Sequence, residues 1–420
     1  MSDQAGDPNL TVLIVGAGLG GLMLGAILES ANISYHILER STEFRPLGSV
    51  ISLTGDIFPV FEQLGIFDEL RDISLPVIST DMFDIKLDAL GSLPAKHLKI
   101  ACGYDTLILA RPNISNLLRQ KVPAHKVSLG KKVIRTKEHN NRVSVYCSDD
   151  TEYECNILVG ADGAYSAVRQ NMFKDLEEED KLPLNDKDAF SICYINMVGI
   201  STPENPENYS QLSDKTRTHS SVVMGNDNDS CYAVTVPGNQ ICWGIQIQLP
   251  EGEAKKQYFT NSEWGPESVD GMLKQYQDFP CAFGGTMKEL MDSTPKNLIS
   301  KVFLEEKVFE TWYHGRSVLI GDGAAVAMKD AVVLANCIYN MRDKTGGSIR
   351  AAFASYYRQR HLEADELANN SAFHTSIMSG HRNMVQEISS HKKEGKKLNG
   401  KRMKPNVMRP TYILTPDFDI

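Results

Sequence analysis

The sequence predicts an α/β fold with two lobes. One lobe is Rossmann-like and contains an inserted antiparallel hairpin region, and the second is an α+β lobe with a mostly antiparallel sheet. Three observations support this prediction: a glycine-rich turn between two short apolar strands, hairpin-like alternation over residues 126–156, and a stretch rich in β-forming residues over 191–249. The length of 420 residues allows two hydrophobic cores.

The first element is a strand–turn–helix–strand unit. Its parts are the strand Val12–Val15, the turn glycines Gly16, Gly18 and Gly21, a helical stretch, and a second strand, Tyr35–Leu38, that ends on Glu39. Gly16 permits a tight turn, Gly18 lets a phosphate approach the backbone, and Gly21 lets the helix pack closely on the strand. The N–H groups at the start of the helix can bind a pyrophosphate, and the Glu39 carboxylate can accept the hydroxyls of a ribose. The unit therefore predicts a dinucleotide-binding site.

Further helices and strands follow this unit along the chain. We expect a loop over 40–47, a strand at 50–53, a helix over 57–70, strands within 79–100, a helix from 111, a buried strand at 157–159, a helical region over 268–291 with a break near 280, strands at 302–308 and 316–320, and helices at 331–340 and 348–372. The charged, proline-containing stretch 175–188 is typical of a boundary between lobes.

Composition narrows the function classes. The net charge of −9 argues against nucleic acid as the principal partner. The eight cysteines are scattered without a CxxC pair, which is typical of reduced thiols in a reducing compartment, and we expect no metal site. Residues 9–28 carry no charge, but five glycines make them a poor transmembrane helix. We therefore expect no transmembrane segment and a location that is cytoplasmic or peripheral on an intracellular membrane.

Two later motifs narrow the type of dinucleotide. The first is Gly160–Arg169 (GADGAYSAVR), and the second is Gly321-Asp322, which follows an apolar strand and precedes Asp330-Ala331. With the first glycine motif, they make the chain resemble the FAD-dependent aromatic-ring hydroxylases, the single-component flavoprotein monooxygenases, over about residues 10–375. Fungal members that act on polycyclic or terpenoid substrates are the most similar. The resemblance implies a glutathione-reductase-type FAD-binding lobe and a second lobe that binds the substrate.

The resemblance also implies roles for particular residues. Gly16, Gly18 and Gly21 would bind the FAD pyrophosphate, and Glu39, with Arg40 beside it, would bind the adenosine ribose. Gly48 would lie in the loop near the flavin, and Arg111 would reach the phosphate region. Asp162 and Arg169 would support FAD and the approach of NAD(P)H, and Asp322, followed by Gly323, would bind the ribityl chain or ribose. The residues alone leave simpler alternatives: a helix cap for Asp322, turn and cap roles for Asp162 and Ser166, and a surface ion pair for Arg111. Tyr194, Met197 and Trp243 could line a substrate pocket or belong to the core.

The same resemblance implies a division of the chain into domains. The FAD-binding domain would comprise residues 9–78, 101–185 and 300–375, and the substrate-binding domain residues 79–100 and 186–299. Residues 376–420 would form a basic, partly disordered C-terminal tail, because 392–404 contain seven Lys or Arg and one Glu. Contact of this tail with anionic lipid is the alternative to a solvated tail.

The function implied by the resemblance is an FAD-dependent monooxygenase. NAD(P)H would serve as a transient co-substrate that reduces FAD, and one atom of O2 would hydroxylate or epoxidise a hydrophobic small molecule. No catalytic side chain is assigned, because the cofactor carries the chemistry. Two alternatives stay open: an FAD-dependent reductase of the prenyl-reductase type, and a degenerate FAD-binding protein without turnover.

The chain departs from the family pattern after the second motif. About eleven residues that the family has between Asp322 and Asp330, including a proline, are absent. In the family this loop packs beside the flavin ring. A gene-model error, an inactive flavoprotein or a rearranged active site would each account for the shortening. Val198 also stands where many relatives have an arginine.

Overall fold

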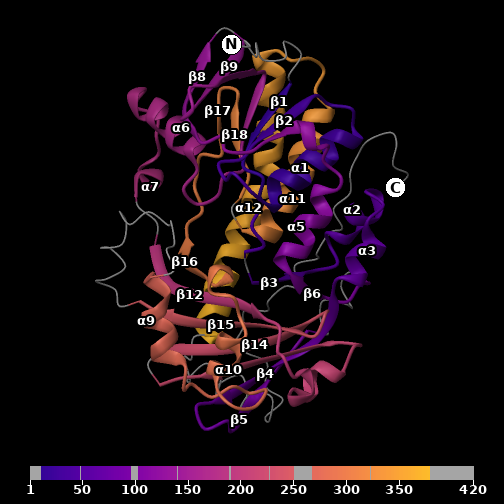
Figure 1. Cartoon of the computed structure of the whole chain (residues 1–420). Helices are drawn as coiled ribbons and strands as arrows, with labels where there is room; N and C mark the ends of the chain where they lie inside the picture. Colours follow the sequence, from indigo (N-terminus) through magenta and orange to yellow (C-terminus); the bar gives the residue numbers. More distant parts are fainter. Residues whose placement is uncertain are drawn as a thin grey trace, which may run out of the picture.

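The computed structural model describes residues 11–378, apart from 48, 96–102, 140, 189–190, 227, 250–266 and 322. A six-stranded sheet lies at one end of the molecule, a nine-stranded sheet lies at the other, and helices α1, α5, α11 and α12 lie between them (Figure 1). The fold therefore combines α and β elements, as the sequence predicts. No helix in these ranges is long and apolar enough to cross a membrane.

The six-stranded sheet has the order β17-β18-β11-β1-β2-β7. Its strands are β17 (Tyr313–His314), β18 (Ser317–Leu319), β11 (Ile157–Gly160), β1 (Val12–Val15), β2 (Tyr35–Leu38) and β7 (Val127–Ser128). All neighbours are parallel except β17 and β18. Every residue of β1 and β11 is buried, because other elements of the chain cover both faces of this parallel sheet.

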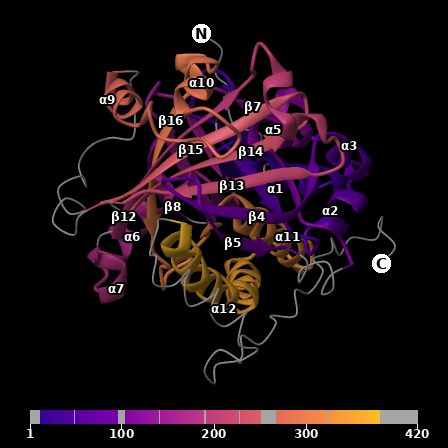
Figure 2. The ribbon, with the colours of Figure 1, turned by 90° about the horizontal axis from the view of Figure 1, so that it is seen from below.

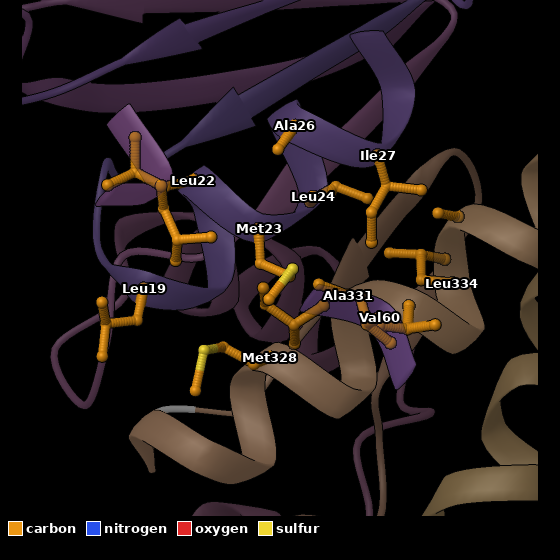
Figure 3. Close-up of a cluster of buried hydrophobic side chains, with 14 of the residues drawn as sticks. Leu19, Leu22, Met23, Leu24, Ala26, Ile27, Val60, Met328, Ala331 and Leu334 are labelled. Carbon is orange, nitrogen blue, oxygen red and sulfur yellow. The ribbon is translucent and has the colours of Figure 1, made fainter. Parts of the chain in front are cut away.

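Helix α1 (Leu19–Ser30) lies between this sheet and helix α11 (Ala324–Tyr339). Figure 3 shows Met23 and Ile27 of α1 directed toward Ala331 and Leu334 of α11. The two helices approach closely at Gly20, where an added Cβ would lie 2.8 Å from the Cβ of Ala327. The apolar sequence of α1 is therefore explained by burial on both sides and does not indicate a membrane anchor.

A smaller antiparallel sheet, β10-β9-β8, covers the other side of the parallel sheet. Its strands are β8 (Val133–His139), β9 (Arg142–Cys147) and β10 (Glu152–Cys155), and helix α6 (Ala167–Glu178) packs beside them. These strands match the hairpin alternation that the sequence shows over 126–156.

The nine-stranded sheet has the order β16-β12-β15-β14-β13-β4-β6-β3, with β5 paired to β4. Its strands are β16 (Ser300–Glu306), β12 (Ser191–Ser201), β15 (Gln240–Gln248), β14 (Asp229–Val236), β13 (Thr218–Met224), β4 (Leu75–Asp84), β6 (Leu107–Ala110), β3 (Val50–Leu53) and β5 (Ala89–Pro94). Only the β4–β13 pair is parallel. Helices α9 (Glu267–Tyr276) and α10 (Met287–Asp292) pack on one face, which we call the outer face (Figure 2).

The remaining helices are α2 (Phe58–Gln63), α3 (Phe67–Asp72), α5 (Arg111–Arg119), α7 (Leu184–Lys187) and α12 (Gly346–Met378), with short 3-10 turns at Ala124–Lys126, Pro206–Asn208, Ser210–Ser213 and Lys296–Leu298. Two predictions are corrected here. The helix expected over 57–70 is two helices, because Gly65 adopts a φ of +65° between them. Helix α11 begins at Ala324, seven residues before the predicted start at 331. The expected tail lies outside the described residues from 379 onward.

Candidate functional site

A cavity of about 450 Å³ lies at the carboxyl ends of the parallel strands. Its lining includes Gly16 after β1, Glu39 after β2, Ala161 after β11 and Ile320 after β18. Ligands of open α/β sheets bind at this edge, because the loops that leave the strands there form a crevice. The cavity is therefore the candidate for the predicted dinucleotide site.

The three motif glycines have distinct structural roles. Gly16 has a φ of +107°, and an added Cβ would lie 2.3 Å from the carbonyl oxygen of Ala161. An added Cβ at Gly21 would lie 2.0 Å from the carbonyl oxygen of Gly16, so Gly21 permits the close approach of helix and strand. Gly18 precedes α1 without a side-chain capping bond, and a Cβ there would meet nothing within 4 Å. The open space at Gly18 therefore suits a phosphate bound at the helix start.

Glu39 is held rigidly at the edge of this cavity. Its Oε2 accepts a hydrogen bond from the N–H of Ala17 at 2.8 Å, and its Oε1 accepts one from the N–H of Ser41 at 2.9 Å. A carboxylate has about four acceptor positions, so each oxygen can still accept one hydroxyl. This geometry is what recognition of the two hydroxyls of a ribose requires.

Asp162 both caps a helix and faces the cavity. Its Oδ2 accepts from the N–H of Ala167 at 2.6 Å, and Ser166 caps the same helix by accepting from the N–H of Arg169 at 3.0 Å. Asp162 and Ser166 therefore both have the helix-capping role that the sequence left open as the simpler alternative. The Oδ1 atom of Asp162 is buried and has no hydrogen-bond partner among the described residues, and burial raises the pKa of the carboxyl group. That oxygen is available to a ligand of the cavity.

A second cavity of about 450 Å³ continues the first one along residues 41–47 and helix α5. The two cavities share Gly18, Glu39 and Arg111. Basic side chains around them are Arg40, Lys131, Lys132, Arg45, Arg111 and Arg119, whereas the acidic ones are Glu39, Glu43 and Asp162. The lining is thus net positive, which favours an anionic ligand such as a pyrophosphate.

Not all of the remaining predicted site residues lie at the cavity. Arg40 is exposed at the cavity, and Gly323 precedes α11 as its N-cap without belonging to the lining. Gly48 and Asp322 lie outside the described residues. Arg169 is not among the lining residues of either cavity, and its guanidinium lies 4.5 Å from the ring centroid of Phe309.

Tyr194, Met197 and Trp243, the candidates for a substrate pocket, lie on two different faces of the nine-stranded sheet. Met197 and Trp243 lie in the core under the outer face, where the indole N–H of Trp243 donates to Thr294 Oγ1 at 2.9 Å. Tyr194 is buried on the opposite face of β12, with Asn196 and Val198. Met197 and Trp243 are therefore packing residues.

Known proteins with similar sequences include FAD-dependent monooxygenases. Residues 9–196 match the family model described as FAD binding domain. The chain is 27% identical over 359 residues to the FAD-dependent monooxygenase esdpE of Penicillium shearii, covering 80% of this chain and 70% of the relative. It is also 27% identical over 384 residues to the FAD-dependent monooxygenase ausM of Aspergillus calidoustus, covering 86% and 78%. The chain is therefore similar to fungal FAD-dependent monooxygenases over most of its length, and its first half matches an FAD binding domain.

Solved structures share the fold of this chain. The structure of Klebsiella pneumoniae HpxO complexed with FAD and uric acid is 18% identical, has a TM-score of 0.71, and covers 94% of this chain and 95% of its own. The 2,6-dihydroxypyridine-3-hydroxylase of Arthrobacter nicotinovorans has a TM-score of 0.64 at 17% identity, covering 95% and 96%. These structures therefore show that the chain has the fold of FAD-containing hydroxylases.

Arg111 provides a test of the predicted anion site. It is the first residue of α5, and no described carboxylate lies within ion-pair distance of it. A cation at a helix N-terminus is unfavourable unless an anion lies beside it. We expect Arg111→Met to lower FAD affinity about 10-fold without lowering the stability of the apoprotein, measured by flavin fluorescence and urea unfolding. Arg71→Met, at an exposed residue of α3, is the control; equal affinities for both variants would contradict the assignment.

Sequence reasoning missed four basic residues of this site. Lys131 and Lys132 belong to the first cavity, and Arg45 and Arg119 belong to the second. The lysines follow β7, whose carboxyl end is at the same sheet edge as that of β2. If the sequence had predicted that β7 joins the parallel sheet beside β2, it would also have placed Lys131 and Lys132 at the edge of the cavity. Arg119 carries no such signal, because only its contact with Phe44, at 4.2 Å from the ring centroid, brings it to the cavity.

Proposed function

We propose that this protein uses NAD(P)H and O2 to hydroxylate or epoxidise a hydrophobic small molecule, with FAD bound in the cavity at the strand ends. The observation that supports this proposal is the fixed Glu39 carboxylate beside the open helix start at Gly18. The chemistry supplied by bound FAD is the transfer of reducing equivalents to O2, with one oxygen atom delivered to the substrate.

The residues of the chain have binding and positioning tasks in this proposal. Gly16, Gly18 and Gly21 shape the pyrophosphate site, Glu39 and Arg40 flank the ribose, and Arg111 neutralises phosphate charge. The free Oδ1 of Asp162 accepts a hydrogen bond from the cofactor. We carry Gly48, Asp322 and Gly323 forward as the flavin-side positions.

We further propose that residues 79–100 and 186–299, which supply most strands of the nine-stranded sheet together with α9 and α10, form the substrate lobe. The FAD-binding domain then comprises residues 9–78, 101–185 and 300–375. Strands β3, β6 and β16 of the nine-stranded sheet belong to these ranges and so connect the two domains. Residues 376–420 are proposed as a basic tail that contacts a membrane surface peripherally.

The inner face of the nine-stranded sheet, opposite α9 and α10, suits a substrate that is apolar with one oxygen. Asn196 and Tyr232 lie on this face among apolar side chains, and Asn196 Nδ2 donates to Tyr232 Oη at 3.4 Å. Tyr232 lies across Gly244, where a Cβ would be 2.2 Å from its ring. The Oδ1 of Asn196 is buried without a hydrogen-bond partner, and Val302 on the next strand is 42% exposed. An unused acceptor beside a hydroxyl donor suits a substrate hydroxyl or carbonyl group.

This inner face is also next to the cofactor site. Strand β3 follows residues 41–47, which line the second cavity, and its first residue, Val50, packs with Tyr232 and Val234. A substrate on the inner face would therefore lie toward the flavin-side loop.

Tyr232→Phe tests the substrate side. The variant removes one hydroxyl, so we expect KM for the substrate to rise about 10-fold, whereas FAD affinity stays unchanged. Steady-state NAD(P)H oxidation and flavin fluorescence measure the two quantities. Tyr146→Phe, in the hairpin sheet, is the control and should change neither. An unchanged KM for Tyr232→Phe would remove this residue from the substrate site.

The overall proposal is tested with labelled oxygen. The purified chain, loaded with FAD, is incubated with NAD(P)H, ¹⁸O₂ and a set of polycyclic apolar compounds. We expect substrate-dependent NAD(P)H oxidation and one ¹⁸O atom in the product. Substrate reduction without O2 consumption would favour the reductase alternative. FAD binding without any NAD(P)H oxidation would favour a protein without turnover, the alternative suggested by the short connection from Gly321 to α11.

A further inference from the structure

A network of five charged side chains joins three elements behind the cofactor cavity. Its members are Asp56, between β3 and α2; Lys329 and Asp330 on α11; and Arg360 and Glu363 on α12. Lys329 pairs with Asp56 and, at 3.4 Å, with Glu363 Oε1. Arg360 donates from Nε to Asp330 Oδ1 at 2.7 Å and pairs with Glu363. Negative and positive charges therefore alternate from one end of the network to the other.

Four of the five side chains are buried. The exposed fractions are 2% for Asp56, 7% for Lys329, 0% for Asp330 and 3% for Arg360, whereas the Glu363 side chain is 41% exposed. Buried ion pairs are seldom more stable than apolar residues of the same size, because desolvation offsets the attraction. Stability alone therefore does not explain why these charges are there.

The two ends of the network touch parts of the chain that surround the cofactor cavity. At one end, Asp330 Oδ2 accepts a hydrogen bond from the N–H of Gly321 at 2.9 Å, and Gly321 lines the cavity. At the other end, Asp56 accepts from Thr54 Oγ1 at 2.5 Å, directly after β3. The network thus links the α11 side of the cavity to the segment that follows residues 41–47.

Helix α11 needs such a link, because its first turn is itself part of the cavity wall. Ala324 and Ala327 line the cavity, and the helix starts directly after Gly323 without a side-chain capping bond. Lys329 lies one turn further along and contacts a different element, the turn at Asp56. Any shift of the first turns of α11 would move Ala324 and Ala327 relative to the cofactor.

We propose that Lys329 is a positioning residue for the cofactor: its pairing with Asp56 fixes the first turns of α11 as a wall of the FAD cavity. This inference rests on the proposed FAD site. It assigns no contact between Lys329 and FAD, since Lys329 is not among the lining residues of either cavity.

The test separates positioning from the burial of a charge. Lys329→Met leaves the Asp56 carboxylate buried and unpaired, so we expect a lower unfolding midpoint and FAD affinity about 10-fold weaker. The double variant Lys329→Met with Asp56→Asn has no unpaired charge at this pair. We expect its unfolding midpoint to recover while FAD affinity stays about 10-fold weak, because the link is still missing. Lys329→Arg should preserve both properties.

FAD affinity is measured on the full chain by flavin fluorescence, and stability is measured by urea unfolding of the apoprotein. Lys126→Met is the matched control: it breaks an ion pair with Glu29, at 2.6 Å, at the far end of α1, and should leave FAD affinity unchanged. Recovery of FAD affinity in the double variant, or wild-type affinity in folded Lys329→Met, would overturn the proposal. If Lys329→Met does not fold, the double variant and Lys329→Arg decide. Failure of the wild-type chain to bind FAD would instead refute the proposed function.

Discussion

A Gly18→Val variant is expected to fold like the wild type and to bind FAD at least about 100-fold more weakly. Gly18 adopts φ −72° and ψ −177°, an extended conformation that valine accepts readily. A Cβ at this position would meet no atom within 4 Å, so the folded apoprotein has space for the side chain. The same space is where a pyrophosphate would approach the N-terminus of α1. The substitution therefore competes with the ligand and leaves the protein core intact.

The measurement for Gly18→Val combines flavin fluorescence titration with urea unfolding of the apoprotein. Gly271→Val is the matched control, because Gly271 is also surrounded by open space but lies in α9, away from both cavities. Gly21→Ala should behave in the opposite way: its Cβ would lie 2.0 Å from the carbonyl oxygen of Gly16, so the apoprotein itself should lose stability. FAD binding by Gly18→Val at wild-type strength would place the pyrophosphate elsewhere.

That Gly16, Gly18 and Glu39 line one cavity was predictable, because the signals for it are local in the sequence. The strand before Gly16, the glycine spacing and the acid that ends the second strand all fall within thirty residues. Parallel pairing of β1 with β2 then brings Glu39 beside Ala17 without any further information. Such short-range patterns are reliable because the parallel strands and the intervening helix leave few other arrangements.

Features that depend on long-range packing were not predictable. The early start of α11 at Ala324 follows from contact with α1 at Gly20, about three hundred residues earlier in the chain. Lys329 and Asp330 lie just before the helix that the sequence predicts to start at 331, and nothing in the sequence marks them as members of a charge network. Their partners, Asp56 and Arg360, are identified only by the folded structure. Sequence periodicity reports which face is buried, but it carries no information about which buried charges meet.

Arg360→Met is expected to cause the largest loss of stability among the substitutions considered, about 3–5 kcal/mol of the free energy of unfolding. Asp330 is 0% exposed, and Arg360 is the cation that contacts its carboxylate, at 2.7 Å from Nε to Oδ1. Without Arg360, the carboxylate keeps neutral neighbours, namely the N–H of Gly321, at 2.9 Å, and the hydroxyl of Tyr356. A buried carboxylate that has lost its cation is poorly compensated, because the protein interior solvates charge much less than water does.

Urea unfolding of the apoprotein measures this effect, and Arg358→Met, at an exposed position of the same helix, is the control. Adding Asp330→Asn to Arg360→Met should recover part of the lost stability, because the remaining amide is neutral and its oxygen can still accept from Gly321. A double variant as unstable as Arg360→Met would show that the packing of the arginine stem, and not the unpaired charge, causes the loss. Comparing FAD affinity between the folded variants then separates the two ends of the network: Asp330 acts on Gly321 at the cavity wall, whereas Lys329 acts on the turn at Asp56.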